Sequence, residues 1–163
     1  MSIVPDVLLG IGRGRMDRIV MGKLRMDVDL IGTIKELAKR EGIRTGVILS
    51  GIGLLKKGTF RNPKSFPPDF KMTDKHRLYV ELDRPMEIVS LTGWIATKDD
   101  GEIEVHGHYS ASTVLEDKTT VFGGHLGPGV ITSINVVVVI GVIEDSNIKA
   151  GLDSNTNQVN VTF

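Results

Sequence analysis

The strongest constraint on the fold is a series of strand-like segments in the second half of the chain. These segments are rich in β-branched and aromatic residues and span 77–82, 86–94, 102–109, 119–123, 133–143 and 158–163. Asp99-Asp100-Gly101 has the composition of a hairpin turn between two of them. Short connections favour antiparallel neighbours, because a parallel pair needs a long crossover. The second half therefore predicts a mostly antiparallel sheet.

The first half predicts one main helix. Apolar residues recur at helical spacing from Leu30 to Ala38, and charged residues occupy the opposite face. Asp27 or Asp29 can cap the first turn, because a short carboxylate accepts the free amides there. Gly42 stands where a left-handed residue is needed to end a helix.

Strand-like runs flank this helix at 18–24 and 47–49, and a Ser-Gly-Ile-Gly turn follows at 50–53. They give the chain a βαβ-like opening. The segment 56–77 contains three prolines and is predicted to be irregular. The whole pattern predicts an α+β fold, in which a mostly antiparallel sheet packs against one main helix.

The length of 163 residues suits one domain with its own core. We expect residues 18–163 to form this domain and residues 1–17 to be a flexible N-terminal segment. No window has the roughly 18 uncharged apolar residues that a membrane span needs, and residues 1–6 lack the features of a signal peptide. We therefore expect a cytoplasmic protein without a membrane span.

The composition excludes some chemistry and leaves the charge distribution open. With no cysteine, the chain has no disulfide, no thiolate metal site and no cysteine nucleophile. Residues 1–77 hold 16 Lys+Arg against 8 Asp+Glu, whereas residues 78–163 hold 4 against 12. In one compact domain the two halves interleave, so this asymmetry can disappear in space.

One apolar run suggests a partner. Val136 to Ile143 is apolar on both faces, which suits a central strand that is covered on both sides. With only one main helix in the chain, another subunit can supply the second cover.

Three of the four histidines lie within 20 positions of the sequence. Residues 102–111 alternate strictly, which puts His106 and His108 side by side on the polar face, about 6.6 Å apart. A hairpin that turns at 114–118 would return His125 to the neighbourhood of His108. Imidazole nitrogens bind zinc at about 2.0–2.1 Å. The pattern predicts a site for a divalent metal ion, zinc first, while a solvated polar face is the simpler alternative.

Three motifs follow one another in the order Pro85-Met86-Glu87-Ile88-Val89-Ser90-Leu91-Thr92-Gly93, His106-Gly107-His108 and Gly123-Gly124-His125-Leu126. This order resembles the PPC family (plant and prokaryote conserved domain), whose pattern is a P-x-E-[IL]-x-S-L-[ST]-G strand, a His-x-His strand and a Gly-Gly-His-Leu turn. The helix end at 37–43 and the turn at 50–53 are also similar, and the resemblance covers about residues 18–150.

The resemblance implies a PPC-like fold and a homotrimer, because prokaryotic members form compact homotrimers. Some of these carry a metal ion on the histidines that match His106, His108 and His125. Plant members join the domain to DNA-binding AT-hooks, which implies association with DNA. Many prokaryotic members have Glu where this chain has Asn135. If that carboxylate serves the site elsewhere, Glu104 or Glu87 would have to replace it here.

Basic residues supply candidate contacts to nucleic acid. Arg13 and Arg15 lie in Gly-Arg-Gly-Arg-Met, which resembles an AT-hook core with Met in place of Pro. Lys56 and Lys57 begin a basic stretch with interleaved phenylalanines, a composition that suits phosphate backbones and stacked bases. A flexible terminus and a solvated loop explain the same residues.

Three classes of function follow. The first is a homotrimeric binding or regulatory module with a three-histidine metal site, associated with DNA by family resemblance. The second is a metal-dependent enzyme, in which an open coordination position activates water and Glu104 or Glu87 accepts the proton. In the third, the metal only stabilises the assembly. The sequence favours the first class.

Overall fold

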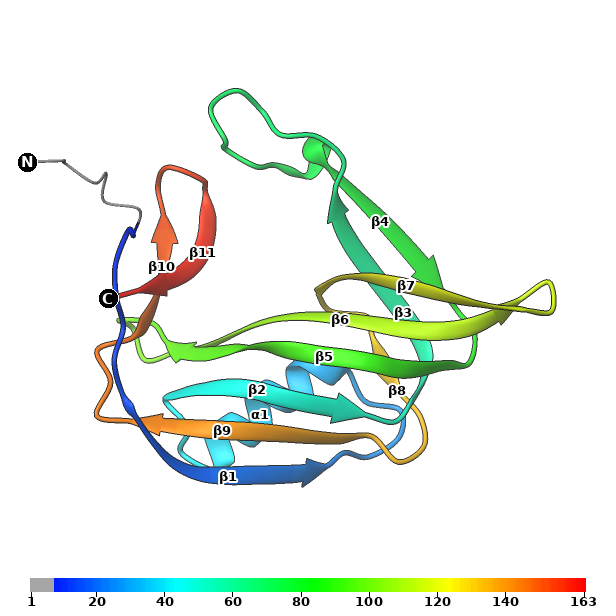
Figure 1. Ribbon diagram of the computed structural model, residues 1–163, viewed down its shortest axis with the longest axis horizontal. Coiled ribbons are helices and arrows are strands. Elements are labelled where there is room, and N and C mark those ends of the chain that lie inside the picture. The colour runs from blue at the N-terminus through cyan, green and yellow to red at the C-terminus, as the bar shows by residue number, and fades with distance from the viewer. Residues whose placement is uncertain (1–7) are drawn as a thin grey trace, which may run out of the picture.

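Most of the chain forms one antiparallel sheet (Figure 1). The computed structural model describes residues 8–163, and the strands among them are β1 (Arg15–Lys23), β2 (Thr45–Ile52), β3 (Leu54–Pro63), β4 (Arg77–Leu82), β5 (Met86–Thr97), β6 (Ile103–Leu115), β7 (Lys118–Leu126), β8 (Ile131–Thr132), β9 (Val137–Glu144), β10 (Lys149–Asp153) and β11 (Gln158–Thr162). Nine strands form the main sheet in the order β1-β9-β2-β5-β6-β7-β3-β4, with β8 paired to β3, while β10 and β11 form a separate hairpin.

The predicted helix is α1 (Leu30–Arg40), and a short 3-10 helix, η1 (Asp74–His76), precedes β4. Of the two candidate caps, Asp29 caps the helix: its Oδ2 accepts a hydrogen bond from the Gly32 amide at 2.9 Å. Gly42 has φ 64°, the left-handed conformation predicted for the helix end. The periodic apolar positions of α1 face the core, where four of them are buried.

The βαβ-like opening is confirmed, with one strand inserted. β1 and β2 each pair antiparallel with β9 and lie on either side of it, so they run parallel to each other. α1 connects them across the inner face of the sheet (Figure 1). The predicted α+β fold, a mostly antiparallel sheet against one helix, is therefore correct.

The core lies between the inner face of the sheet and α1. Phe60 and Tyr109 stack at its centre with ring centroids 4.7 Å apart, and the Tyr109 hydroxyl donates to the Thr59 carbonyl at 2.9 Å. No buried side-chain nitrogen or oxygen of the described residues lacks a hydrogen-bond partner. This packing holds β3 and β6 firmly, which matters because both strands carry residues of the candidate site.

The structure corrects several predicted segments. The first part of 56–77, predicted to be irregular, is the regular strand β3, which ends at Pro63. Residues 133–136, predicted as strand, form a connection between β8 and β9, where Asn135 has φ 56°. β10 was not predicted at all. The Gly-Gly-His-Leu segment is predicted to be a turn, but in the structure it is the last part of β7.

Part of the predicted N-terminal segment contributes to the main sheet. β1 begins at Arg15, so the last three residues of the predicted N-terminal segment belong to this strand, and Arg15 and Met16 pair with β9. Residues 1–7 lie outside the described residues, and they contain the segment 1–6 that is predicted to lack signal-peptide features. No helix among residues 8–163 has the length and apolar character to span a membrane.

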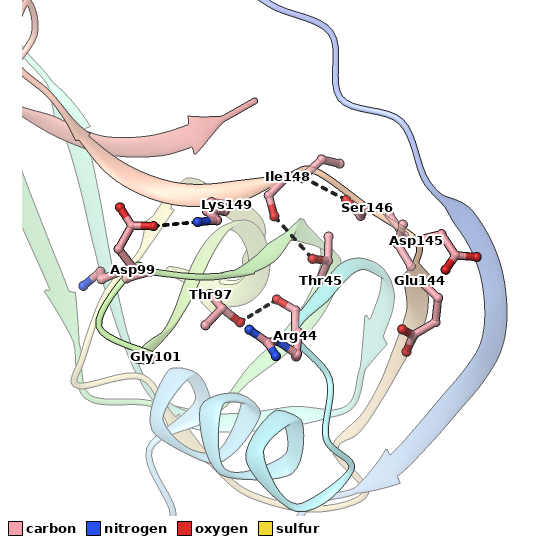
Figure 2. A pocket seen from close by; sticks show the side chains of 12 residues that line it. Arg44, Thr45, Thr97, Asp99, Gly101, Glu144, Asp145, Ser146, Ile148 and Lys149 are labelled. Carbon is pink, nitrogen blue, oxygen red and sulfur yellow. Dashed lines mark hydrogen bonds and ion pairs between the residues drawn. The ribbon is translucent and has the colours of Figure 1, made fainter.

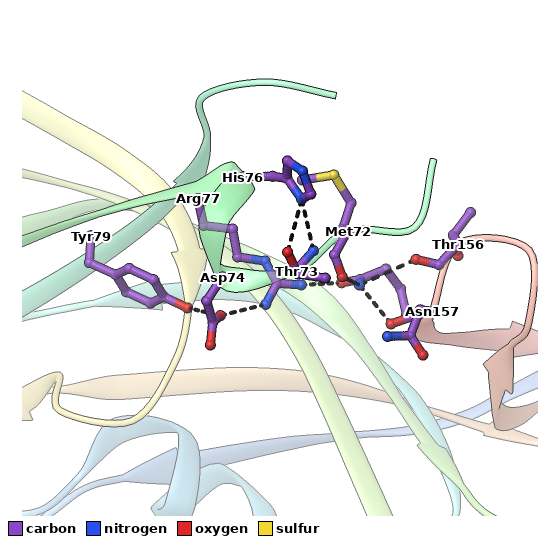
Figure 3. A network of polar contacts seen from close by, with 9 residues as sticks. Met72, Thr73, Asp74, His76, Arg77, Tyr79, Thr156 and Asn157 are labelled. Atoms are coloured by element: carbon purple, nitrogen blue, oxygen red, sulfur yellow. Dashed lines mark hydrogen bonds and ion pairs between the residues drawn. The ribbon is translucent and has the colours of Figure 1, made fainter. Parts of the chain in front are cut away.

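The C-terminal hairpin is tied to the loop before β4 by polar contacts (Figure 3). The Met72 amide donates to the Thr156 carbonyl at 3.2 Å. The Arg77 guanidinium donates to Gln158 Oε1 at 2.6 Å and to Asp74 Oδ1 at 3.2 Å, and the Tyr79 hydroxyl donates to the same carboxylate at 2.9 Å. These contacts bring the first residue of β11 to the first residue of β4, and both residues line a cavity with the histidines described below.

The charge asymmetry between the two halves of the sequence is mixed in space, as expected. Ion pairs join basic residues of the first half to acidic residues of the second, namely Arg15–Asp145, Arg18–Glu144, Lys35–Glu104 and Lys57–Glu81. The fold therefore does not separate a basic arm from an acidic body.

Candidate metal centre

His106 and His108 occupy the polar face of β6. Their neighbours Val105 and Tyr109 are buried, so the alternation predicted from the sequence holds along the strand. β6 turns into β7 through Glu116 and Asp117, and the returning strand places His125 directly opposite His108. The predicted hairpin is thus confirmed, and it brings all three histidines together.

The geometry of this histidine cluster suits a tetrahedral metal ion. His106 Nε2 and His108 Nε2 are 3.3 Å apart, and one ring nitrogen from each of the three histidines lies within 4.8 Å of the others. Two ligands at 2.0–2.1 Å from zinc, at a tetrahedral angle, are separated by about 3.3–3.4 Å. The first pair already has this separation, and the His125 nitrogen lies within 4.8 Å of both.

Two glycines of the motifs allow the strands to approach around the cluster. A Cβ atom on Gly93 would collide with the carbonyl oxygen of His106 on the paired strand. A Cβ atom on Gly124 would lie 2.7 Å from Asn62 Nδ2 and 2.9 Å from the Arg61 carbonyl oxygen. Both glycines are therefore required by close packing beside the histidines.

The surroundings favour neutral imidazoles, the form that binds metal ions. Burial, with Arg61 as the next cause, lowers the pKa of His125 to about 3. Burial also lowers the pKa of His106, with a smaller contribution from the charge of His108. Trp94 stacks on His106 with centroids 5.1 Å apart and holds its ring in place. Near neutral pH the cluster can accept a cation without first releasing protons from these two rings.

The two candidate carboxylates lie in different places. Glu104 lies close to the cluster and lines a cavity beside His106, but its carboxylate pairs with Lys98 at 2.9 Å and Lys35 at 3.7 Å. Glu87 pairs with Ser112 at the far end of β5 and lines another cavity that contains none of the histidines. Of the two, the fold brings only Glu104 to the histidine cluster.

Asn135 also lies away from the cluster. It precedes β9 and packs against Gly53, and it lines neither of the cavities beside the histidines. Its φ of 56° explains the residue type, because asparagine tolerates the left-handed region better than most side chains. In this chain, the residue at position 135 is therefore explained by the left-handed backbone conformation of the connection before β9.

Two cavities flank the cluster. The larger, of about 510 Å³, is lined by His106 and His125 together with residues of α1 and β11. The smaller, of about 230 Å³, is lined by all three histidines. Arg61 and Arg77 line both cavities. From the sequence, both arginines belong to the basic stretch with possible nucleic-acid contacts, and nothing there connects them with the histidines.

A third cavity, of about 340 Å³, lies where β2 begins and β5 and β9 end (Figure 2). Its polar groups contact one another: Lys149 pairs with Asp99 at 2.8 Å, and the Thr97 hydroxyl donates to the Arg44 carbonyl at 2.9 Å. It contains no histidine and does not belong to the cluster.

The four candidate nucleic-acid contacts do not form one patch with the histidines. Arg15 forms an ion pair with Asp145 at 3.3 Å. The backbone amide of Arg13 donates a hydrogen bond to Asn147 Oδ1 at 3.1 Å. Lys56 pairs with Asp27, and Lys57 pairs with Glu81 at 3.3 Å. These side chains are distributed over strand ends and are largely engaged by carboxylates.

Comparison with known proteins defines the family. The Plants and Prokaryotes Conserved (PCC) domain matches residues 12–144, which include all three histidines. The chain therefore belongs to the PCC family, also abbreviated PPC. No curated protein matches the chain.

Solved structures show the same fold. A PPC protein from Pyrococcus horikoshii is 27% identical, with a TM-score of 0.72 over 93% of this chain and 96% of that one. A metal-containing protein from Archaeoglobus fulgidus is 21% identical, with a TM-score of 0.75 over 95% and 100% of the two chains. A candidate DNA-binding protein from Bacteroides thetaiotaomicron is 19% identical, with a TM-score of 0.70 over 91% and 94%.

Proposed function

We propose that this protein is a metal-binding module of the PCC family, in which His106, His108 and His125 hold one divalent ion. The observation that carries the proposal is the convergence of three ring nitrogens within 4.8 Å, from two strands that pair in register. The register of the hairpin brings the side chains together, and the proposal adds that their ring nitrogens share one ion.

Zinc is the ion that the donor set favours. Neutral imidazoles suit zinc, and three protein ligands leave the fourth tetrahedral position for water or a ligand. The lowered pKa values of His106 and His125 keep these rings neutral near neutral pH, with one ring nitrogen of each able to bind an ion. The fold neighbour from Archaeoglobus fulgidus contains a metal, which is consistent with this assignment.

The test is elemental analysis of untagged protein beside the double variant His106→Ala/His108→Ala. We expect about one ion per chain in the wild type and none in the double variant. His76→Ala is the matched control, because His76 lies outside the cluster and its ring accepts from the Thr73 amide at 3.2 Å. Wild-type protein that stays free of metal after incubation with zinc would contradict the proposal.

We further propose that the module is a homotrimer. Met16, Ile19, Met21 and Leu49 are exposed apolar side chains of β1 and β2, and a Cβ on Gly141 of β9 would touch Met16 and Leu49. An apolar outer face over a central strand needs a cover, and in a cyclic trimer each copy would cover this face with a different surface of its neighbour. Light scattering on wild type and Met21→Glu tests this: the trimer should dissociate in the variant.

As a binding module, the protein is expected to work in the cytoplasm and to associate with DNA. The support for DNA is the name of the fold neighbour from Bacteroides thetaiotaomicron and the basic residues described above. Because these residues are exposed and ion-paired, the interaction should be weak and strongly dependent on salt.

One observation favours a metal-dependent enzyme as the second candidate. The cavity of about 510 Å³ opens beside His106 and His125 and has room for a substrate next to the proposed ion. Of the two candidate proton acceptors Glu104 is the one beside the cluster, and its carboxylate is already paired with Lys98 and Lys35. Turnover that disappears in His108→Ala, with the fold intact, would establish the enzyme.

A further inference from the structure

Arg61 places a positive charge beside the histidine cluster. It lies opposite His125 in the pairing of β3 with β7, and because Phe60 points into the core, Arg61 points to the histidine side of the sheet. The guanidinium is half-buried, and its charge is one of the causes that lower the pKa of both His106 and His125. The cluster and Arg61 therefore share one local environment.

The other charged side chains around the cluster already have ion-pair or hydrogen-bond partners within the protein. Arg77 pairs with Asp74 at 3.2 Å and donates to Gln158. Lys98 pairs with Glu104. The carboxylate of Asp29 accepts from the backbone amides of Gly32 and Gly129 at 2.9 and 2.7 Å.

Arg61 differs from these residues. Among residues 8–163 it takes part in none of the ion pairs within 4.0 Å, and its polar neighbour is the Tyr79 hydroxyl, which itself donates to Asp74. Burial and the nearby Arg77 lower its pKa, although an arginine stays charged at any physiological pH. The carboxylate of Asp74 acts on this charge without forming an ion pair and is shared with Arg77 and Tyr79, so a ligand carboxylate at closer range would stabilise the half-buried guanidinium.

A metal ion would increase the positive charge beside Arg61. The three imidazoles are neutral ligands, so the double positive charge of the ion would remain uncompensated, with Arg61 beside it. No carboxylate of the described chain completes the cluster, because Glu104 is engaged by two lysines and Glu87 lies elsewhere. A negatively charged ligand from outside the protein would compensate this charge.

The larger cavity indicates what kind of molecule could supply the negative charge. Its volume of about 510 Å³ is that of a metabolite site. Apolar side chains line part of it, including Ile31, Val105, Leu126 and Val159, together with the charged residues Asp29, Lys35, Arg61, Arg77 and Glu104. An inorganic ion would leave this apolar wall uncovered.

We infer that the cavity binds a small organic carboxylate, whose carboxylate group contacts Arg61 and the open position of the metal ion while its hydrocarbon part lies against the apolar wall. This inference rests on the proposed metal site. Planar guanidinium and carboxylate groups form paired hydrogen bonds, which fixes the orientation of the ligand. Arg77, held by Asp74 and Gln158, maintains the positive wall behind it.

The experiment is calorimetric titration of the zinc-loaded protein with hexanoate, acetate and inorganic phosphate, with zinc content measured in every sample. We expect hexanoate to bind one per chain, and more tightly than acetate by up to about fourfold for each CH₂ group that the cavity buries. Arg61→Gln should keep its zinc and bind hexanoate about ten- to a hundredfold more weakly. Arg84→Gln is the matched control, because Arg84 contacts the Val114 carbonyl, away from the cluster.

The outcomes separate this inference from the proposed function. Wild-type protein that retains no zinc overturns the metal site, and the inference falls with it. Protein that retains zinc but does not bind hexanoate, or binds it equally well in Arg61→Gln, overturns the inference alone. Inorganic phosphate that binds more tightly than hexanoate, with the same dependence on Arg61, overturns the assignment to an organic carboxylate. As an independent readout, hexanoate should change the visible spectrum of the cobalt-substituted protein if it reaches the ion.

Discussion

The histidine cluster and the scattered basic residues make an instructive comparison. Both were candidate sites from residue type alone. The histidines lie on paired strands in register, and their ring nitrogens meet within 4.8 Å. Arg15, Lys56 and Lys57 are engaged by carboxylates at separate strand ends. Residue type proposes both sites, and convergence of the side chains supports only the histidine cluster.

The difference has a structural cause. A strand repeats its side-chain direction every second residue, so His106 and His108 must point the same way, and a hairpin fixes the register of the strand that returns. The basic residues are spread along segments that the fold sends to different edges. Long charged side chains at exposed edges pair with whichever carboxylate is near, and each such pair contributes little.

The largest expected effect is the loss of a metal ligand. His125→Ala should weaken zinc binding by more than the roughly 10–100-fold that changes in outer-shell partners cause, because a ligand is removed outright. Competition with a chelator of known affinity measures this. His76→Ala should bind zinc as the wild type does, and equal effects of the two changes would place the ion elsewhere.

The pH dependence of stability provides a second test of the cluster. The pKa of His125 is lowered to about 3 in the folded apoprotein, against 6.5 for an unperturbed histidine. Between these values the unfolded chain binds more protons, so the free energy of unfolding should fall as the pH drops below about 6.5. His125→Gln lacks this titration, and urea unfolding should show a shallower loss of stability. Identical slopes would mean that His125 titrates normally in the folded protein.

The basic residues should have a smaller effect, visible only in DNA binding at low salt. Each phosphate contact that is removed should reduce the slope of log K against log salt by about 0.9. The combined variant Arg13→Ala/Arg15→Ala/Lys56→Ala/Lys57→Ala should therefore bind DNA more weakly with a reduced slope, as measured by fluorescence anisotropy. Its zinc content should not change. A slope that stays the same would remove these four residues from any DNA interface.

The smallest effect is expected at Glu104. Its carboxylate is bound by Lys98 and Lys35 near the surface, and such pairs contribute about 0.2–1 kcal/mol. Glu104→Gln should therefore change the zinc affinity less than tenfold in an equilibrium titration. A larger loss would show that the carboxylate acts on the ion itself and would strengthen the enzyme alternative.

Local patterns predicted a large part of the fold and of the cluster. The spacing of apolar residues from Leu30 to Ala38 predicted α1, and the alternation along β6 placed His106 and His108 on one face. The hairpin composition predicted that His125 returns to His108. Each of these features depends on residues close together in the sequence.

Features that depend on distant residues were missed. The lysines and the terminal proline of β3 suggested a loop, but pairing with β4 and β7 overrides this weak preference. Arg61 meets His125 only through that pairing, across more than sixty positions. The same holds for Gln158, which reaches Arg77 from the C-terminal hairpin. The amino-acid pattern carries no short-range signal for such contacts.

The most direct measurement of the central claim is an anomalous difference map at the zinc absorption edge, from crystals of the zinc-loaded protein. The account predicts one strong peak per chain, bound by one ring nitrogen each of His106, His108 and His125 at about 2.0–2.1 Å. A map without a peak among these three side chains, or with its only peak at another residue, would contradict it.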